Sequence, residues 1–406
     1  MRGFRLTTRG RWFVGAAVLL FGVAAIGSAP ALLYPTGLLL GLVILAVVFV
    51  AGGHSKVQVD RVFSPQVVDP GQVVRARLVV ANAASMSRPE AQWVDHLPSV
   101  VAGRAEGLLP ALGPVGTPDS KVSTTFTLQS STRGHHPVGP LLIRLRDPFG
   151  LVERSRSFGD VHRLTVLPRR YRLDPIRPAG SHDDGATRPA PQHAGAGEND
   201  VIARPYTPGD AMKRLHWKAT AHRGELMVRQ EEQHLDPRAA VLIDLDAASQ
   251  GTVQHRDSWE YSPGLEWAIS AAASITTHLV QAGYVVVVGS DGGTVDGVVA
   301  EGHETIQDVM IQLAECEPTS GPIRFTADGE HVTFLVTGRL EADRAAGWIE
   351  ATARGGAVHA VVSRSTRQAV LDQLLDADLR VTTYTPQADV PEVWAALDDR
   401  NAHAAR

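Results

Sequence analysis

Two long stretches without a charged side chain open the sequence, and they constrain the fold more than any other feature. Residues 12–29 and residues 31–51 are uncharged and mostly apolar. As helices rising about 1.5 Å per residue, they would measure roughly 27–31 Å, close to the ~30 Å hydrocarbon core of a bilayer. Pro30 and the Tyr-Pro-Thr-Gly segment at 34–37 supply turn residues between them. The pattern predicts a transmembrane hairpin over residues 1–53, whose second helix starts near residue 31 or near Thr36.

A cleaved signal peptide is the alternative interpretation of the first stretch. Several arginines precede an apolar run that ends in Gly27-Ser28-Ala29, which is typical of such a peptide. Against it, Pro30 would follow the cleavage point directly, and a second apolar run begins at once. We therefore expect both stretches to remain as membrane helices.

The basic residues that flank the two helices predict their orientation. Arg2, Arg5, Arg9 and Arg11 precede the first helix, Lys56 and Arg61 follow the second, and the connection between the helices is uncharged. Lys and Arg are enriched on the cytoplasmic side of membrane proteins. The sequence thus predicts a multi-pass protein of the cell membrane, with everything after residue 53 in the cytoplasm.

The bulk properties exclude some classes of protein. The 406 residues carry a formal net charge of −4, with no long basic run outside the N-terminus, so nucleic acid is not an expected partner. Cys316 is the single cysteine, which rules out a disulfide framework within the chain. Two glutamates flank it, a setting unlike that of a reactive thiolate.

Residues 54–170 show the alternation of apolar and polar residues that is typical of β-strands. Turn residues such as Asp69-Pro70-Gly71 separate the apolar runs. Short strands at this spacing predict a small antiparallel β-sandwich with no catalytic feature of its own. The expected strands are 57–62, 73–80, 122–128, 141–145 and 164–167.

The remaining sequence divides into a linker and a larger domain. Residues 171–200 are rich in Gly, Pro and polar residues and are expected to form a flexible linker. From residue 201 to 406, buried-type strands alternate with helical patterns, which predicts a doubly wound α/β domain with a mostly parallel sheet. The expected strands are 239–245, 284–289, 331–336, 358–362 and 379–384, and the expected helices are 264–282, 305–314, 341–352 and 366–375.

The segment from Arg204 to His222 holds the densest group of chemically distinctive residues. Asp210 follows Pro208-Gly209 and is well placed to cap a helix over 211–217. Two interpretations stay open: a capped turn that packs Trp217 onto the sheet, or a docking surface. The candidate docking residues are Arg204, Tyr206, Gly209, Asp210, Lys213, Arg214, His216 and Trp217.

The order of these residues resembles a bacterial family catalogued as domain of unknown function 58. The resemblance rests on Arg204-x-Tyr206-x-x-Gly209-Asp210, then His216-Trp217, Thr220-Ala221 and Leu226-x-Val228-Arg229. Upstream, Arg133-Gly134, Gly139-Pro140 and Asp147-Pro148-Phe149-Gly150-Leu151 resemble the family's β-region. His222 departs from the pattern, because the family usually carries arginine there.

The resemblance implies a C-terminal domain similar to von Willebrand factor A domains. It also implies an association with MoxR-type AAA+ ATPases, since members are commonly encoded beside them. No enzymatic activity is established for the family as a whole.

A von Willebrand A domain often binds Mg²⁺ through Asp-x-Ser-x-Ser after its first strand. Here Asp244 matches the first ligand, but Asp246 and Ala248 stand where the two serines would be, and Asp291 is a candidate distal carboxylate. Because Mg²⁺ prefers a near-ideal set of oxygen ligands, this degenerate site is expected to bind metal weakly or not at all. We therefore expect no cofactor.

The leading functional hypothesis is a membrane-tethered adaptor that docks a MoxR-type ATPase through its α/β domain. No Gly-x-Ser-x-Gly, His-Glu-x-x-His or Walker sequence is present, so the chain is not expected to be an enzyme. Two alternatives remain open: a hydrolase or peptidase with an unrecognised site, and an outward-facing adhesion protein of opposite topology.

Overall fold

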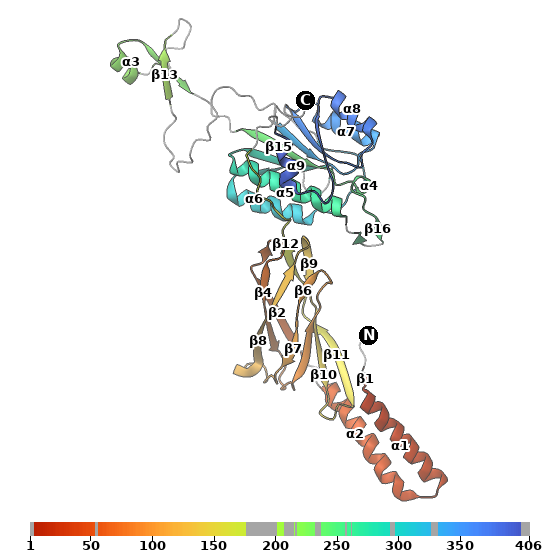
Figure 1. Ribbon diagram of the computed structural model, residues 1–406. Helices are drawn as coiled ribbons and strands as arrows, with labels where there is room; N and C mark the ends of the chain where they lie inside the picture. Colours follow the sequence, from red (N-terminus) through yellow and green to blue (C-terminus); the bar gives the residue numbers. More distant parts are fainter. Residues whose placement is uncertain are drawn as a thin grey trace. The chain divides into compact units, whose positions relative to one another are not determined.

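The computed structural model divides the chain into two compact units, which are described separately (Figure 1). The first unit comprises Met1–Arg169 and Met310–Cys316, and the second comprises Arg170–Val309 and Glu317–Arg406. The residues that the structure describes are 4–52, 56–175, 201–206, 215, 217–231, 237–255, 258–260, 262–292, 297–325 and 332–398. Most of the expected linker, residues 176–200, therefore lies outside the described residues.

Two helices near the N-terminus are long and apolar enough to cross a membrane. They are α1 (Thr8–Ile26) and α2 (Leu33–Gly52), joined by the short 3-10 helix η1 (Pro30–Leu32). The first helix begins at residue 8 instead of the predicted 12, because the hydroxyl of Thr7 accepts a hydrogen bond from the Gly10 amide at 3.1 Å and caps the helix.

The outer surfaces of both helices are apolar and exposed. Leu19 of α1 is 69 % exposed and Leu38 of α2 is 65 % exposed. A helix that is apolar on all sides is typical of a buried or membrane-spanning helix. The composition and exposure of the hairpin therefore agree with a membrane anchor.

The remainder of the first unit is built mainly from strands. They form a four-stranded sheet in the order β2-β4-β8-β6, a five-stranded sheet in the order β1-β11-β10-β5-β7, and a three-stranded sheet in the order β3-β12-β9. The strands are β1 (Phe4–Leu6), β2 (Val57–Ser64), β3 (Val67–Val68), β4 (Val73–Asn82), β5 (Ala91–Asp95), β6 (Val101–Gly103), β7 (Glu106–Leu109), β8 (Lys121–Ser130), β9 (Gly134–Val138), β10 (Leu141–Arg146), β11 (Val152–Phe158) and β12 (His162–Val166), with the 3-10 helix η2 (Pro118–Ser120) before β8.

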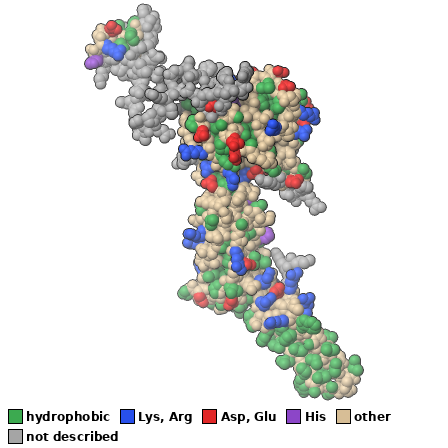
Figure 2. Space-filling model, viewed as in Figure 1, with side chains coloured by type: hydrophobic (Ala, Val, Ile, Leu, Met, Phe, Trp, Pro, Cys, Tyr) green, Lys and Arg blue, Asp and Glu red, His purple; other side chains and the backbone are tan. Residues whose placement is uncertain are grey.

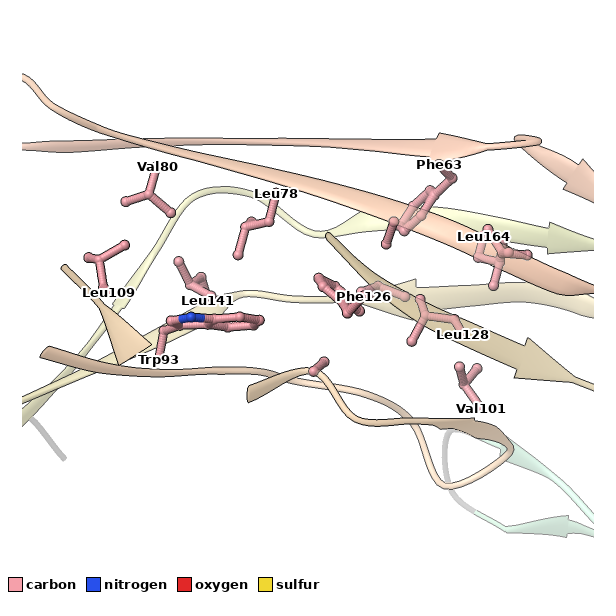
Figure 3. Packing of buried hydrophobic residues seen from close by; sticks show 14 of the residues in the cluster. Phe63, Leu78, Val80, Trp93, Val101, Leu109, Phe126, Leu128, Leu141 and Leu164 are labelled. Atoms are coloured by element: carbon pink, nitrogen blue, oxygen red, sulfur yellow. The ribbon is translucent and has the colours of Figure 1, made fainter. Parts of the chain in front are cut away.

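These three sheets share one hydrophobic core (Figure 3). Inward-facing side chains such as Leu78 on β4, Trp93 on β5 and Leu164 on β12 meet in it, and each is less than 5 % exposed. Alternate residues along each strand point into the core, as the alternation in the sequence predicts. Burial of this apolar surface is the main favourable contribution to the stability of the β-region.

The Asp147-Pro148-Phe149-Gly150-Leu151 sequence forms the turn that attaches the β-region to the hairpin. The Asp147 carboxylate accepts hydrogen bonds from the amides of Phe149 at 2.9 Å and Val152 at 2.6 Å, which closes the turn. The Thr7 hydroxyl donates to the Gly150 carbonyl, and the Thr7 amide donates to the Leu151 carbonyl at 2.9 Å. The start of α1 is therefore bonded directly to this turn.

Gly10 permits the close approach at this junction. A Cβ atom at Gly10 would lie 2.1 Å from the Leu151 carbonyl oxygen, a distance that no side chain can occupy. The opposite side of the junction is apolar, because Val43, Ala46 and Val50 of α2 pack with Leu151 and Val152. The hairpin and the β-region thus share a small core of their own.

The second unit contains a six-stranded sheet in the order β19-β18-β15-β20-β21-β22. All neighbouring strands are parallel except β19, which pairs antiparallel with β18 at one edge. The elements of this unit are β13 (Val201–Pro205), α3 (Trp217–Arg223), β14 (Met227–Glu231), β15 (Arg238–Ile243), α4 (Ala247–Gln250), β16 (Gln254–His255), β17 (Ser258–Trp259), α5 (Pro263–Gln281), β18 (Val285–Ser290), β19 (Val298–Ala300), β20 (Val332–Val336), α7 (Ala342–Thr352), β21 (Val358–Ser363), α8 (Gln368–Asp376), β22 (Arg380–Tyr384) and α9 (Val390–Ala395), while α6 (Gly302–Glu315) has residues in both units.

Helices cover both faces of this sheet. On one face, Trp348 of α7 and Leu374 of α8 pack against strand residues such as Leu335. On the other, Trp267 of α5 stacks on Tyr384 at a ring separation of 3.7 Å, and Trp394 of α9 lies 5.3 Å from Phe334. This is the mixed α/β arrangement that the alternation of strand and helix patterns predicts.

Candidate functional site

The carboxyl ends of the central parallel strands bring three acidic residues to one edge of the sheet. Asp244 follows β15 directly, and Asp291 follows the neighbouring strand β18. Asp246 lies two residues after Asp244, at the start of α4. The carboxyl edge of such a sheet is the usual place for ligand binding, especially where the strand order reverses. Here the reversal falls between β15 and β20, beside Asp244.

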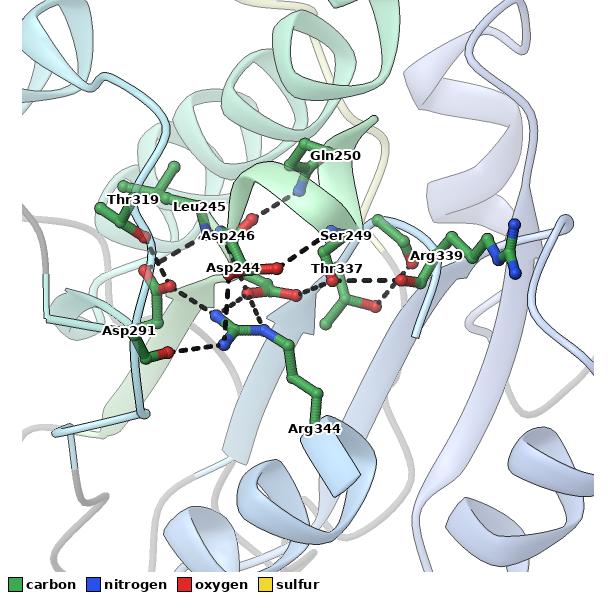
Figure 4. A network of polar contacts seen from close by, with 12 residues as sticks. Asp244, Leu245, Asp246, Ser249, Gln250, Asp291, Thr319, Thr337, Arg339 and Arg344 are labelled. Carbon is green, nitrogen blue, oxygen red and sulfur yellow. Dashed lines mark hydrogen bonds and ion pairs between the residues drawn. The ribbon is translucent and has the colours of Figure 1, made fainter. Parts of the chain in front are cut away.

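Arg344, in the first turn of α7, extends its guanidinium group into the middle of these carboxylates (Figure 4). Its Nε donates to Asp244 Oδ1 at 2.9 Å, and its Nη2 contacts both Asp244 Oδ1 and Asp291 Oδ2 at 2.5 Å. Its Nη1 donates to the Gly321 carbonyl at 3.0 Å and lies 3.7 Å from Asp246 Oδ1. The arginine thus stands where a cation shared by the three carboxylates would bind.

Two hydroxyl groups complete the network. Ser249 donates to Asp244 Oδ2 at 2.6 Å, and Thr319 donates to Asp291 Oδ2 at 2.7 Å. Asp246 caps α4 by accepting the Ser249 amide at 3.1 Å. The serine that donates a hydrogen bond to Asp244 is therefore Ser249. It lies one residue after Ala248, which occupies the position of the second serine in the A-domain pattern. Hydroxyl groups therefore reach the carboxylates from Ser249 and Thr319, while positions 246 and 248 carry none.

Burial determines the electrostatics of the network. Burial raises the pKa of Asp244, and the hydrogen bonds and charge of Arg344 only partly oppose this effect. Burial alone would lower the pKa of Arg344, but its hydrogen bonds to Asp244 and the charges of all three carboxylates outweigh it and raise the pKa. Arg344 therefore keeps its proton, and the network holds together as an internal ion cluster.

This geometry leaves little binding capacity at the three acidic candidates. The side chains of Asp244 and Asp291 are 0 % and 2 % exposed, and that of Arg344 is 15 % exposed. Among the described residues, no group of three or more His, Cys, Asp and Glu side chains is arranged to hold a metal ion. In the described part of the chain, Arg344 is the cation that these carboxylates meet.

Sequence reasoning missed Arg344, Ser249 and Thr319. Arg344 lies 100 residues from Asp244, and no local pattern links the two. One signal was available: a strand at 332–336 followed by a helix places the first turn of that helix at the same sheet edge. Only the strand order, however, shows that this edge adjoins Asp244.

The candidate docking segment is described in part. Gly209, Asp210, Lys213, Arg214 and His216 lie outside the described residues, so the proposed cap by Asp210 does too. The backbone of Arg204 belongs to β13, which pairs antiparallel with β14, and Leu215 bridges to Val228. Tyr206 is partly buried, and its amide donates to the Leu226 carbonyl at 2.8 Å.

The position of Trp217 contradicts the interpretation of this segment as a turn that packs Trp217 onto the sheet. It is 69 % exposed at the start of α3 and is not packed onto the sheet. A helix also begins at Trp217, where the sequence predicted that one would end. The interpretation as a turn that buries Trp217 is therefore wrong, which leaves a large aromatic side chain at the surface.

Comparisons with known proteins agree with the resemblance in the same region. Residues 202–367 match the family model described as "Protein of unknown function DUF58". A curated relative, the "Uncharacterized protein YeaD" of Bacillus subtilis (strain 168), is 27 % identical over 123 residues. That match covers 30 % of this chain and 31 % of the relative, so it spans about a third of each protein. Neither description assigns a role.

Solved structures add no information about function. The CARDB domain of the PF1109 protein from Pyrococcus furiosus matches with 14 % identity and a TM-score of 0.19, covering 25 % of this chain and 92 % of that one. The sporulation control protein Spo0M of Bacillus subtilis matches with 14 % identity and a TM-score of 0.15, covering 27 % of this chain and 49 % of that one. Scores this low carry no argument about fold or function.

Proposed function

We propose that this protein is a membrane-anchored adaptor whose second unit docks a protein partner in the cytoplasm. The observation that carries the proposal is the position of Arg344 among Asp244, Asp246 and Asp291. A metal-dependent hydrolase or adhesion site needs free oxygen ligands, and a catalytic carboxylate needs access to its substrate. The guanidinium group of Arg344 already bonds to Asp244 and Asp291, so these carboxylates are available neither to a metal ion nor to a substrate.

The second unit is, in this proposal, a von Willebrand A-like domain that works without a metal ion. The sheet has the order 3-2-1-4-5-6 when its strands are numbered along the chain, with an antiparallel third strand at one edge. Asp244 follows the first of these strands, as the first ligand of an A domain does. Arg344 replaces the cation and holds the loops at the sheet edge in place.

The docking surface in this proposal is the segment from Arg204 to Trp217. Trp217 is 69 % exposed, and tryptophan is enriched among the residues that carry most of the binding energy at interfaces. The family match begins at residue 202 and includes this segment. The expected partner is a MoxR-type AAA+ ATPase, which is the class of protein that the resemblance implies.

The test is a binding measurement with the full chain in lipid nanodiscs and a purified MoxR-type ATPase from the same organism. Trp217→Ala is expected to weaken binding at least about tenfold while leaving the melting temperature nearly unchanged, because the side chain is exposed. Lys213→Glu with Arg214→Glu is expected to do the same. Leu375→Ala is the matched control, since Leu375 is an apolar residue of the same unit that is 52 % exposed.

Two outcomes would contradict this proposal. If the wild-type protein does not bind the ATPase, the proposed partner is wrong. If Trp217→Ala and Leu375→Ala weaken binding equally, the proposed docking surface is wrong. Hydrolysis of a peptide or ester by the purified chain, lost on substitution of Asp244, would favour the hydrolase alternative.

A further inference from the structure

A small pocket in the first unit combines an apolar floor with an arginine-rich wall. The floor includes Leu109 of β7 and Ile143 of β10, and Val50 of α2 also lines the pocket. The wall is formed by Arg88, Arg154 and Arg156. None of the described residues that line the pocket is acidic.

The register of the edge strands explains why arginines face this pocket. Arg156 lies opposite Ile143, and Arg154 lies opposite Leu145, across the antiparallel pair β10–β11. Directly paired residues point to the same face of a sheet, so these arginines lie on the face that elsewhere forms the core. Charged residues on the core-facing side of a strand are uncommon, since burial of a charge is costly unless it is compensated.

Aromatic contacts hold these guanidinium groups in place. Those of Arg88 and Arg156 lie 5.3 Å and 5.6 Å from the centre of the Phe158 ring, and that of Arg154 lies 4.6 Å from the centre of the Phe4 ring. Arg88 is only 9 % exposed. Burial, together with the charge of Arg156, lowers the pKa of Arg88 to about 10. Arg88, Arg154 and Arg156 thus bring three guanidinium groups to one pocket.

The pocket lies at the end of the hairpin from which both helices join the β-region. Val50 is two residues from the end of α2, and α1 starts at the same end because η1 connects the opposite ends. Trp12 and Tyr34, which are 75 % and 82 % exposed, occupy the two ends of the hairpin. Trp and Tyr are enriched where a membrane meets water, so the level of Trp12 corresponds to the lipid headgroups.

Further arginines surround the same level. Figure 2 shows Lys and Arg side chains where the apolar hairpin meets the strands. Arg5 and Arg9 lie beside the start of α1 at this level. Anionic lipids attract such clusters electrostatically.

We propose that this pocket binds the phosphate group of an anionic phospholipid from the adjoining leaflet. Arg154 and Arg156 contact the phosphate in this arrangement, while Arg88 contributes charge from behind. The volume of the pocket is about 40 Å³, which suits a group of a few heavy atoms and leaves the rest of the lipid outside, along α2. Arginine suits this role because its planar group binds phosphate oxygens through two hydrogen bonds. The inference rests on the proposed membrane anchor and is independent of the adaptor role.

The test is native mass spectrometry of the full chain in detergent micelles, with phosphatidylglycerol and phosphatidylcholine of identical acyl chains supplied at equal concentration. The wild type should retain phosphatidylglycerol in preference. Arg154→Gln with Arg156→Gln should reduce this retention about tenfold, to the level of phosphatidylcholine. Arg144→Gln with Arg146→Gln is the matched control, because it removes the same charge from the same sheet on its opposite face and should leave the preference intact.

Additional measurements separate lipid binding from misfolding and from the binding of free phosphate. Circular dichroism checks that each variant folds, and the single variant Arg156→Gln, at an exposed position, should show a partial loss. Inorganic phosphate at millimolar concentration should not displace the lipid. Displacement by free phosphate, equal retention of the two lipids, or an equal loss in the control pair would each overturn the inference. Binding of a polyglutamate peptide to Arg154 and Arg156 without any lipid preference would also overturn it.

Flotation with lipid vesicles distinguishes a failure of the proposed membrane anchor from a failure of the proposed lipid site. A chain that does not float with the vesicles contradicts the anchor itself. A chain that floats but shows no preference for phosphatidylglycerol contradicts only the lipid site.

Discussion

At the scale of single residues, Arg344 is the side chain on which the candidate site depends. It contributes hydrogen bonds to Asp244 and Asp291 and a charge beside Asp246. Removal of one partner from a buried ion pair is costly because the other charge stays buried without compensation. The network therefore belongs to the stability of the sheet edge as well as to its chemistry.

Arg344→Met should lower the free energy of unfolding by about 3–5 kcal/mol, measured by chemical denaturation. Arg339→Met should change it by less than about 0.5 kcal/mol, since the ion pair of Arg339 with Glu341 is exposed. Asp244→Asn added to Arg344→Met should restore part of the loss, because it removes the uncompensated carboxylate. A double variant less stable than Arg344→Met would contradict this account.

The pH dependence of the Arg344→Met variant has a definite sign. Burial raises the pKa of Asp244 in the folded state, so the folded state binds the Asp244 proton more tightly than the unfolded state does. Such a group contributes stability below its unfolded pKa, and the contribution is lost as the pH rises through the folded pKa. In Arg344→Met, Arg344 no longer opposes this rise in the pKa, so protonation of Asp244 relieves the variant more than the wild type. The difference in the free energy of unfolding between wild type and Arg344→Met should therefore narrow as the pH falls from about 7 to about 4. A gap that widens on acidification would contradict the assignment to Asp244.

Calorimetry of the wild type with Mg²⁺ should show no site tighter than roughly millimolar, because the position of a shared cation is occupied by Arg344. Saturable micromolar binding that disappears in Asp244→Ala would show that the carboxylates accept a metal despite the arginine. Arg339→Met serves as the control for general charge effects.

At the scale of elements, the junction between α1 and the turn at residues 147–151 is the most informative feature. It combines the hydrogen bonds of Thr7, the carboxylate of Asp147 and the absence of a side chain at Gly10. The Asp-Pro-Phe-Gly-Leu sequence that resembled a family pattern has a structural role here, since it forms the turn onto which the hairpin docks.

Gly10→Ala should destabilise this junction even though alanine favours a helix by about 1 kcal/mol over glycine. The added Cβ would lie 2.1 Å from the Leu151 carbonyl, so the helix or the turn has to move. Gly15→Ala is the matched control, because no atom beyond the neighbouring backbone of its own helix lies within 4 Å of its added Cβ. The measurement is the rate of proteolysis in detergent near residues 147–151, which should rise for Gly10→Ala only. Equal rates in both variants would show that the junction tolerates the shift.

At the scale of the whole molecule, the chain forms two units, and the first of them contains the apolar hairpin. In the proposed adaptor the hairpin is the membrane anchor, and the arginines near its base, including Arg5, Arg9 and Arg11, predict which side of the membrane carries the folded parts. This orientation separates the adaptor proposal from the outward-facing adhesion alternative.

Cysteine accessibility tests the orientation. In a Cys316→Ser background, a cysteine at the exposed position Ser85 should react with a membrane-impermeant maleimide only after the cells are lysed. A cysteine at Ser28, in the connection between α1 and α2, should react in intact cells. The reverse pattern would place the folded units outside and favour the adhesion alternative.

The sequence by itself determined the elements whose evidence is local. The uncharged runs predicted the helical hairpin, and several predicted strands and helices of the second unit lie within a few residues of the observed ones, as for α5 and β21. The period of the apolar residues predicts such elements, because it indicates which residues of a helix or strand are buried. Asp244 and Asp291 were found for the same reason, since each follows a recognisable strand.

Tertiary structure alone decided what these residues meet. Arg344 reaches Asp244 across 100 residues because the parallel sheet places β15 beside β20 and brings the next helix to the same edge. Arg154 and Arg156 lie on the same face of the sheet as the core residues Ile143 and Leu145 because of the register of β11 on β10, which the composition of the strand does not reveal. Pairing between distant segments depends on the packing of the whole domain, so the local sequence pattern does not predict it.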